Sequence, residues 1–119
     1  MVRVLQRLGV EVDFPPDQTC CGQPAFNAGF VSDARAVARR FLDVFSDSEY
    51  IVVPSGSCGS MAKVFTPRLF REEPQTQRRA EELAGRVYEL SDFLVNVLGM
   101  TDVGAAYSGR VTYHASCHL

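Results

Sequence analysis

The sequence has no long apolar run and no leader-like opening. A helix that spans a membrane needs about 20 consecutive, mostly apolar residues, and a secretory signal peptide needs a basic start followed by an apolar segment. Neither pattern is present. The sequence therefore predicts no membrane span, and we expect a cytoplasmic protein.

The chain also has no excess of positive charge. Its 12 Lys and Arg residues stand against 14 Asp and Glu residues, which gives a formal net charge of −2. The basic residues are scattered among acidic ones, whereas electrostatic binding of nucleic acid requires a basic patch. We expect no nucleic-acid partner. With 119 residues, 46% of them hydrophobic, the chain can bury one core, so residues 1–119 are expected to form a single domain.

Only four cysteines are present, and their arrangement argues against disulfide bonds. Cys20 and Cys21 are neighbours, and a bridge between adjacent residues is strained because favourable bridges join Cα atoms that lie farther apart. The chain also lacks the secretory context of a disulfide framework. Thiolates that bind a metal, or a redox-active thiol, fit this pattern better.

The cysteine pair lies in residues 19–24 (TCCGQP). Side chains of adjacent residues point to opposite faces of an extended strand, so Cys20 and Cys21 serve one site only if the backbone turns between them. Gly22 tolerates such a turn, and Pro24 stiffens the segment that follows. The sequence predicts a turn at this pair.

Hydrophobic periodicity and capping residues predict alternating helices and strands. The run at 50–54 (YIVVP) is continuously apolar and β-branched, which is typical of a strand buried in a parallel sheet. We therefore expect an α/β fold, with a small, mostly parallel sheet and flanking helices. The expected helices cover 1–8, 32–45 with Ser32 as N-cap, 61–65 before Pro67, 75–83 with Pro74 as its candidate first residue (N1), and 92–98 with Ser91 as N-cap; the expected strands cover 10–14, 50–54 and 110–114.

Cysteines follow all three expected strands. Cys20 and Cys21 come after the first, Cys58 after the second and Cys117 after the third. Sites in open α/β sheets form beyond the carboxyl ends of the strands, and soft thiolates select zinc or iron–sulfur clusters. The spacing alone does not choose between these two, because the chain has no C-x-x-C: Met61 stands where the second cysteine of such a motif would follow Cys58.

Simpler interpretations remain open. Free cysteine is among the most buried residue types, so each cysteine could serve only in packing. His114 and His118 flank Cys117 and are better explained as structural residues than as ligands. A thiol enzyme with Cys58 as nucleophile would need a base, for which His118 is the one candidate.

Three stretches resemble a known family: residues 19–25 (TCCGQPA), 53–58 (VPSGSC) and 113–119 (YHASCHL). They are similar to the cysteine-rich CCG family of iron–sulfur proteins, and more closely to its iron–sulfur subunits of lactate and glycolate oxidation. The resemblance covers essentially the whole chain.

The resemblance implies a ligand set and a role. Members have two modules, each with a lone cysteine, a cysteine pair and a later cysteine. Cys20 and Cys21 match the pair, Cys58 matches the later cysteine, and Cys117 matches the lone cysteine that opens the second module. An iron–sulfur cluster of the 4Fe-4S type is then expected in the full-length protein, with electron transfer in L-lactate or glycolate oxidation beside other subunits of a complex. Such a chain is a subunit of an oxidoreductase rather than a self-sufficient catalyst.

Departures from the family pattern predict a fragment. The strand and lone cysteine expected before Met1 are absent, and so is the second cysteine pair expected after Leu119. We expect a first module that runs into the start of a second one. Cys117 is then a candidate to replace the missing lone cysteine. The alternative is a module without redox activity, which binds zinc structurally or serves in subunit contact.

Overall fold

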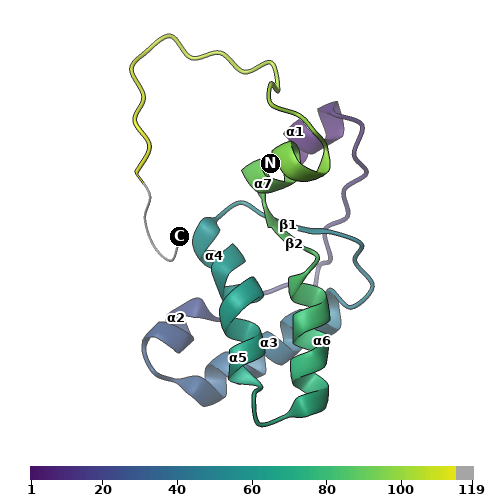
Figure 1. The fold of residues 1–119 in the computed structure, drawn as a ribbon, viewed down its shortest axis with the longest axis vertical. Coiled ribbons are helices and arrows are strands. Elements are labelled where there is room, and N and C mark those ends of the chain that lie inside the picture. The colour runs from purple at the N-terminus through teal and green to yellow at the C-terminus, as the bar shows by residue number, and fades with distance from the viewer. Residues whose placement is uncertain (115–119) are drawn as a thin grey trace.

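A computed structural model describes residues 1–114 as helices arranged around a two-stranded parallel sheet (Figure 1). The predicted α/β class is confirmed. No helix in this described part is long and apolar enough to cross a membrane. The elements are α1 (Val2–Arg7), α2 (Gln23–Asn27), α3 (Val31–Val44), β1 (Ile51–Val53), α4 (Gly56–Ser60), η1 (Met61–Phe65), α5 (Thr66–Leu69), α6 (Pro74–Ala84), β2 (Val87–Glu89), α7 (Leu90–Asp92) and η2 (Phe93–Val97), where η marks a wider, π-helical turn.

The sheet pairs β1 with β2 in parallel, with Ile51 opposite Val87 and Val53 opposite Glu89. Parallel strands need a long crossover connection, and α4, η1, α5 and α6 supply it. The predicted strand at 50–54 is confirmed. The strand β2 was missed, because it has three residues and directly follows a polar helix.

Helix α3 buries one stripe, formed by Ala34, Ala38 and Leu42 at intervals of four residues. This helical spacing places the three side chains on one face, as the sequence predicts. The predicted N-cap is wrong, because the helix begins at Val31 and Phe30 occupies the cap position. Asp33 lies in the first turn, where its charge is favourable to the helix dipole.

The helix after β1 continues farther than predicted. It was expected to end before Pro67, but α4, η1 and α5 follow one another without a break to Leu69. Pro67 lies in the first turn of α5, directly after the wider turn η1. A proline donates no backbone hydrogen bond and interrupts a regular helical ladder, and the wider turn just before it accommodates that interruption.

The core lies where α3, the crossover helices and the sheet meet. Its largest fully buried side chains are Phe70, Leu42, Met61 and Val87. Burial of apolar surface on this scale is the main force that holds such a domain together. The buried cluster comprises Ala34, Ala38, Leu42, Ile51, Met61, Ala62, Leu69, Phe70, Ala80, Leu83 and Val87.

Two predicted strands are absent. Residues 10–14 and 110–114 form no strand in the structure. Alternating polarity favours a strand only where a neighbouring strand accepts its backbone hydrogen bonds. Phe14 is 68% exposed, and Val111 and Tyr113 are each 81% exposed, so these three side chains are not packed. In Figure 1 residues 98–114 run as an extended coil outside the helices.

The predicted cap at Ser91 is also wrong. The N-cap residue of α7 is Glu89, whose carboxylate accepts a 2.7 Å hydrogen bond from the backbone N–H of Ser91. A carboxylate at a helix N-terminus satisfies a free N–H group in the same way as a serine hydroxyl. Pro74 is the first residue of α6, as predicted, and this helix ends one residue beyond the predicted range, at Ala84.

Candidate metal centre

Two cysteine thiols meet near the carboxyl end of β1. The Sγ atoms of Cys21 and Cys58 lie 3.4 Å apart, and the Cys21 thiol donates a hydrogen bond to the Cys58 sulfur. Both side chains are half-buried, and Cys21 packs against the core. Residues 37 positions apart in the chain thus form one dithiol site.

The backbone turns sharply just after Cys21, as predicted. Gly22 is the N-cap residue of α2 and has φ +86°, a left-handed conformation that only glycine adopts readily. It also lies against α3, since a Cβ at this position would sit 3.4 Å from Val37 Cγ1. The turn fixes Cys21 where the chain enters α2.

Cys58 lies in α4, which begins directly after β1 and its loop. The next residue, Gly59, is buried, and a Cβ there would lie 3.3 Å from Val53 Cγ2. The absence of a side chain at Gly59 therefore lets α4 pack closely on β1. At the start of α4, the hydroxyl groups of its N-cap residue Ser55 and of Ser57 share a 2.9 Å hydrogen bond. Together these contacts place Cys58 at the end of the strand.

The two thiols have different environments. Burial raises the pKa of the Cys21 thiol from 9.0 to about 11. The hydrogen bond to Cys58 and the nearby Cys58 and Cys20 sulfurs also raise it, whereas a backbone hydrogen bond from Gln23 lowers it. A low-dielectric surrounding disfavours the charged thiolate. A bound cation reverses this preference, because a thiol that coordinates a metal is deprotonated.

The remaining predicted ligands are not brought to this pair within the described residues. Cys20 is exposed, and it follows an irregular loop rather than the predicted strand. Cys117 and His118 lie outside the described residues, and His114 is exposed. Among residues 1–114, no three His, Cys, Asp or Glu side chains gather closely enough to hold a metal ion.

The spacing of the pair suits one metal ion. Two thiolates at 2.3 Å from a tetrahedral zinc ion lie about 3.8 Å apart, close to the observed 3.4 Å. In an iron–sulfur cluster held by four cysteines, the thiolates are distributed over the cluster irons. Among residues 1–114, Cys21 and Cys58 are thus the two thiols of such a ligand set that already lie together.

Sequence reasoning missed two residues that shape the site. Gln23 is only 8% exposed, and its backbone N–H contacts the Cys21 sulfur. Gly59 was read only as part of a Gly/Ser loop. The sequence signal was that Gly59 directly follows Cys58, because a glycine next to a ligand residue often allows two backbone segments to approach closely. Beside Gln23, the rings of Phe26 and Phe65 pack with centroids 5.0 Å apart.

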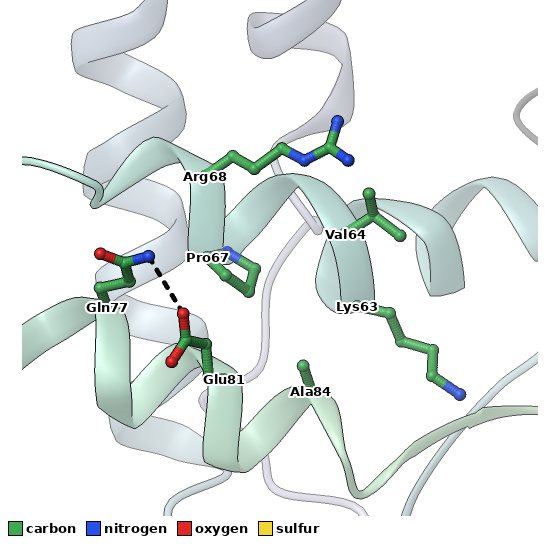
Figure 2. A pocket seen from close by; sticks show the side chains of 7 residues that line it. All are labelled: Lys63, Val64, Pro67, Arg68, Gln77, Glu81 and Ala84. Carbon is green, nitrogen blue, oxygen red and sulfur yellow. Dashed lines mark hydrogen bonds between the residues drawn. The ribbon is translucent and has the colours of Figure 1, made fainter.

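A separate shallow pocket of about 390 Å³ lies between the crossover helices (Figure 2). Lys63 and Arg68 lie on one side, and a 3.0 Å hydrogen bond joins Gln77 to Glu81 on the other. No cysteine lines this pocket. It is therefore distinct from the dithiol site.

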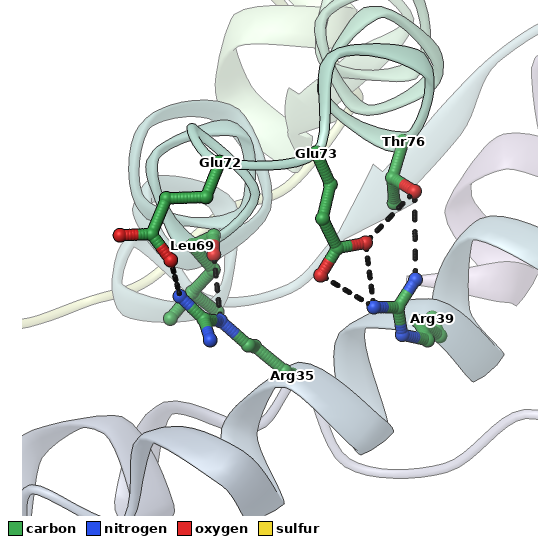
Figure 3. A network of polar contacts seen from close by, with 6 residues as sticks. All are labelled: Arg35, Arg39, Leu69, Glu72, Glu73 and Thr76. Atoms are coloured by element: carbon green, nitrogen blue, oxygen red, sulfur yellow. Dashed lines mark hydrogen bonds and ion pairs between the residues drawn. The ribbon is translucent and has the colours of Figure 1, made fainter.

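Polar contacts join α3 to the segment before α6 (Figure 3). Arg39 donates to both carboxylate oxygens of Glu73 at 2.6 Å, and Thr76 donates to the same carboxylate at 3.2 Å. Arg35 donates to the Leu69 carbonyl at 2.8 Å. Because α3 also carries Val37, which contacts the Gly22 turn, these bonds help to position the Cys21 side of the site.

The fold and the thiol pair define an α/β module that presents cysteine sulfur at the end of a parallel strand. The model of the cysteine-rich domain family, CCG, matches residues 1–63. The chain therefore belongs to this family.

Curated relatives match almost the whole chain. Lactate utilization protein A of Geobacillus thermodenitrificans is 51% identical over 118 residues, which cover 99% of this chain and 49% of the relative. The proteins of the same name from Bacillus licheniformis and Bacillus subtilis strain 168 are each 52% identical with the same coverage. The chain thus spans about half the length of these relatives. No solved structure matches it.

Proposed function

We propose that this chain is the cluster-binding part of an iron–sulfur protein that carries electrons in L-lactate oxidation. Its relatives are named for lactate utilisation, and the family is cysteine-rich. The single observation that carries the proposal is that the fold brings the thiols of Cys21 and Cys58, 37 positions apart in the chain, to the same strand end. Thiolates are the protein ligands of iron–sulfur clusters.

The proposed ligands are Cys20, Cys21, Cys58 and Cys117. Cys20 precedes Cys21 directly and its charge acts on that thiol, so a rotation of its exposed side chain toward the pair would add a third thiolate. Cys117 would come from the start of a second module. In this arrangement the cluster supplies the redox chemistry, and the protein supplies thiolates and a partly apolar surrounding. Lactate is favoured over glycolate by the names of the relatives. Other subunits of a lactate-oxidising complex are the proposed partners, and the cytoplasm is the proposed location.

Anaerobic preparation tests the proposal. The chain is purified without oxygen, supplied with ferrous iron and sulfide, and freed of unbound ions. We expect visible absorption together with equal amounts of iron and acid-labile sulfide, as a 4Fe-4S cluster requires. The C58S variant should lose this absorption, whereas a fully coloured C58S variant would contradict the proposed ligand. A colourless wild-type chain would contradict cluster binding by residues 1–119.

A structural zinc site is a second candidate function, because the Sγ–Sγ distance of 3.4 Å is close to the value for two thiolates on one zinc ion. In this role the metal would hold the loop at Cys21 to the start of α4. A colourless chain that binds one equivalent of zinc, with a raised unfolding temperature, would support it. Zinc that binds equally well to the C21S/C58S double variant would contradict it.

A further inference from the structure

We propose that Cys21 and Cys58 form a reversible disulfide bond when the metal-free chain meets a low-molecular-weight disulfide. The bond would join the loop before α2 to α4 and would remove both thiols from metal binding. Its formation depends only on the geometry of the metal-free chain. Its effect on metal loading rests on the proposed function.

The geometry of the pair favours this bond. The sulfur atoms are already in contact at 3.4 Å, and a disulfide requires about 2.05 Å. Both cysteines are free in the structure, and each is half-buried. Neither sulfur is therefore sealed inside the core, and small side-chain rotations bring them to bonding distance.

Cys20, the third described cysteine, is not expected to take part in a disulfide bridge. A bond between the neighbours Cys20 and Cys21 would be strained. The Cys20 side chain is exposed, and the Cys21 thiol donates its hydrogen bond to Cys58. The structure therefore favours one bridge, with Cys20 left as a free thiol.

The reaction is two successive thiol–disulfide exchanges. One thiolate of the pair attacks a sulfur of the reagent, which forms a mixed disulfide and releases one reagent thiolate. The second thiolate of the pair then attacks the protein sulfur of the mixed disulfide and releases the other reagent thiolate. Two electrons pass from the cysteine pair to the reagent. The two protons lost by the cysteine thiols are taken up by the two released thiolates.

The second step is favoured by proximity. Once one cysteine carries the mixed disulfide, its partner is held beside it, and a reaction within one molecule outpaces attack by a second reagent molecule. The mixed disulfide at this pair should therefore be short-lived. An isolated exposed thiol such as Cys20 has no such neighbour in position and should keep its adduct until a reductant removes it.

Glutathione disulfide is the probe. The reduced, metal-free chain of 119 residues is incubated with it, remaining thiols are alkylated, and the digested protein is mapped by mass spectrometry. We expect a peptide pair joined through Cys21 and Cys58, while Cys20 is alkylated or carries glutathione. Dithiothreitol should restore both thiols. Bridges that involve Cys20 or Cys117, or glutathione adducts on Cys21 or Cys58 without a bridge, would overturn the proposal.

Two variants control for selectivity. C20S should form the bridge at the wild-type rate, whereas C58S should form none and should accumulate glutathione on Cys21. Circular dichroism shows whether each variant is folded. The wild-type map alone decides the question if a variant does not fold.

Metal loading is measured separately. Zinc bound by the oxidised wild-type chain should fall about tenfold relative to the reduced chain, because thiolates in a disulfide no longer act as ligands. A bridge without any change in zinc binding would support the disulfide and contradict the pair as ligands. Normal iron and sulfide loading of the reduced chain without a bridge after oxidation would contradict the disulfide alone.

Discussion

Partial burial of Cys21 disfavours the thiolate form, which metal binding requires. Burial raises its pKa to about 11, so at neutral pH the thiol remains protonated in the metal-free chain. Metal binding must release this proton. The site is therefore expected to bind metal more tightly as pH rises, since less work is needed to deprotonate Cys21.

This environment should make Cys21 a slow nucleophile. A rise in pKa from 9.0 to about 11 lowers the thiolate fraction about 100-fold near pH 8, and the higher intrinsic reactivity of a more basic thiolate restores about tenfold of that loss. We expect iodoacetamide to alkylate Cys21 about tenfold more slowly in the folded, metal-free chain than in the chain unfolded in urea. Equal rates in the two states, read by mass spectrometry, would contradict the role of burial.

Gly22 should be needed both for stability and for the site. Replacement by alanine places a side chain at φ +86°, which costs about 1–2 kcal/mol. Gly29 is a matched control, because its φ is +81° and a Cβ there would meet no atom within 4 Å. Both G22A and G29A should lose similar stability in urea unfolding.

Metal retention should differ between the G22A and G29A variants. Only G22A alters the turn that holds Cys21, so only G22A should also lose zinc or iron retention. Equal retention in G22A and G29A would show that the Gly22 turn does not position the thiol.

Among the elements, α3 connects the core to the site. Leu42 is 2% exposed and lies in the buried stripe of this helix. The L42A variant should lose about 2–5 kcal/mol of unfolding free energy, because it removes buried contacts and leaves a cavity. V95A serves as the control, since Val95 is 47% exposed and should change stability by less than about 0.5 kcal/mol. A loss of similar size in both variants, measured by urea unfolding, would contradict the assigned core.

The contact between Arg39 of α3 and Glu73 at the start of α6 should contribute less stability in acid. The hydrogen bonds from Arg39 lower the pKa of the Glu73 carboxyl below its ordinary value of 4.5. A lowered pKa in the folded state means that the unfolded chain takes up the proton first as pH falls. The stabilisation is thus complete above pH 4.5 and is lost as pH falls through the lowered pKa of Glu73.

The E73Q variant tests this contact. Its unfolding temperature should fall less than that of the wild type between pH 5 and the acid limit of folding. E72Q is the control, because Glu72 lies beside Glu73 and contacts Arg35 only at 3.7 Å. An identical acid response in E73Q and the wild type would contradict the role of Arg39.

Helical periodicity and the apolar run at 50–54 predicted the elements that carry the core. The sequence signal was strong there because burial imposes a regular pattern, as in the stripe of Ala34, Ala38 and Leu42. The sequence signal failed where a strand forms only if a neighbouring strand pairs with it. Val111 and Tyr113 have strand-like spacing, but no described strand pairs with them, and a pattern does not reveal whether a partner strand is present.

The sequence likewise predicted some features of the candidate site and missed others. The turn at Gly22 and the position of Cys58 after a strand followed from local chemistry. The sequence predicted that the cysteines after the strands share a site, but which of them meet depends on how α2 packs on α3 and α4 on β1. The roles of Gln23 and Gly59 depend on burial and close approach, which the sequence alone does not measure.

At the scale of the whole molecule, the chain is an α/β module of the cysteine-rich domain family that spans about half of its curated relatives. Two thiols meet within residues 1–114. We propose that the remaining ligands come from Cys20 and from a second module that begins near Cys117. In a chain as long as the curated relatives, the extended segment at 110–114 would then become a strand of that second module.

The most direct test is X-ray absorption at the edge of the bound metal, which counts its sulfur neighbours. In the wild-type chain loaded with iron and sulfide, or with zinc, we expect a shell of sulfur scatterers at about 2.3 Å for either metal. The C21S/C58S double variant should lose thiolate sulfur from this shell or retain no metal. The same metal content and the same sulfur count in the wild type and the double variant would contradict the claim that Cys21 and Cys58 bind one centre.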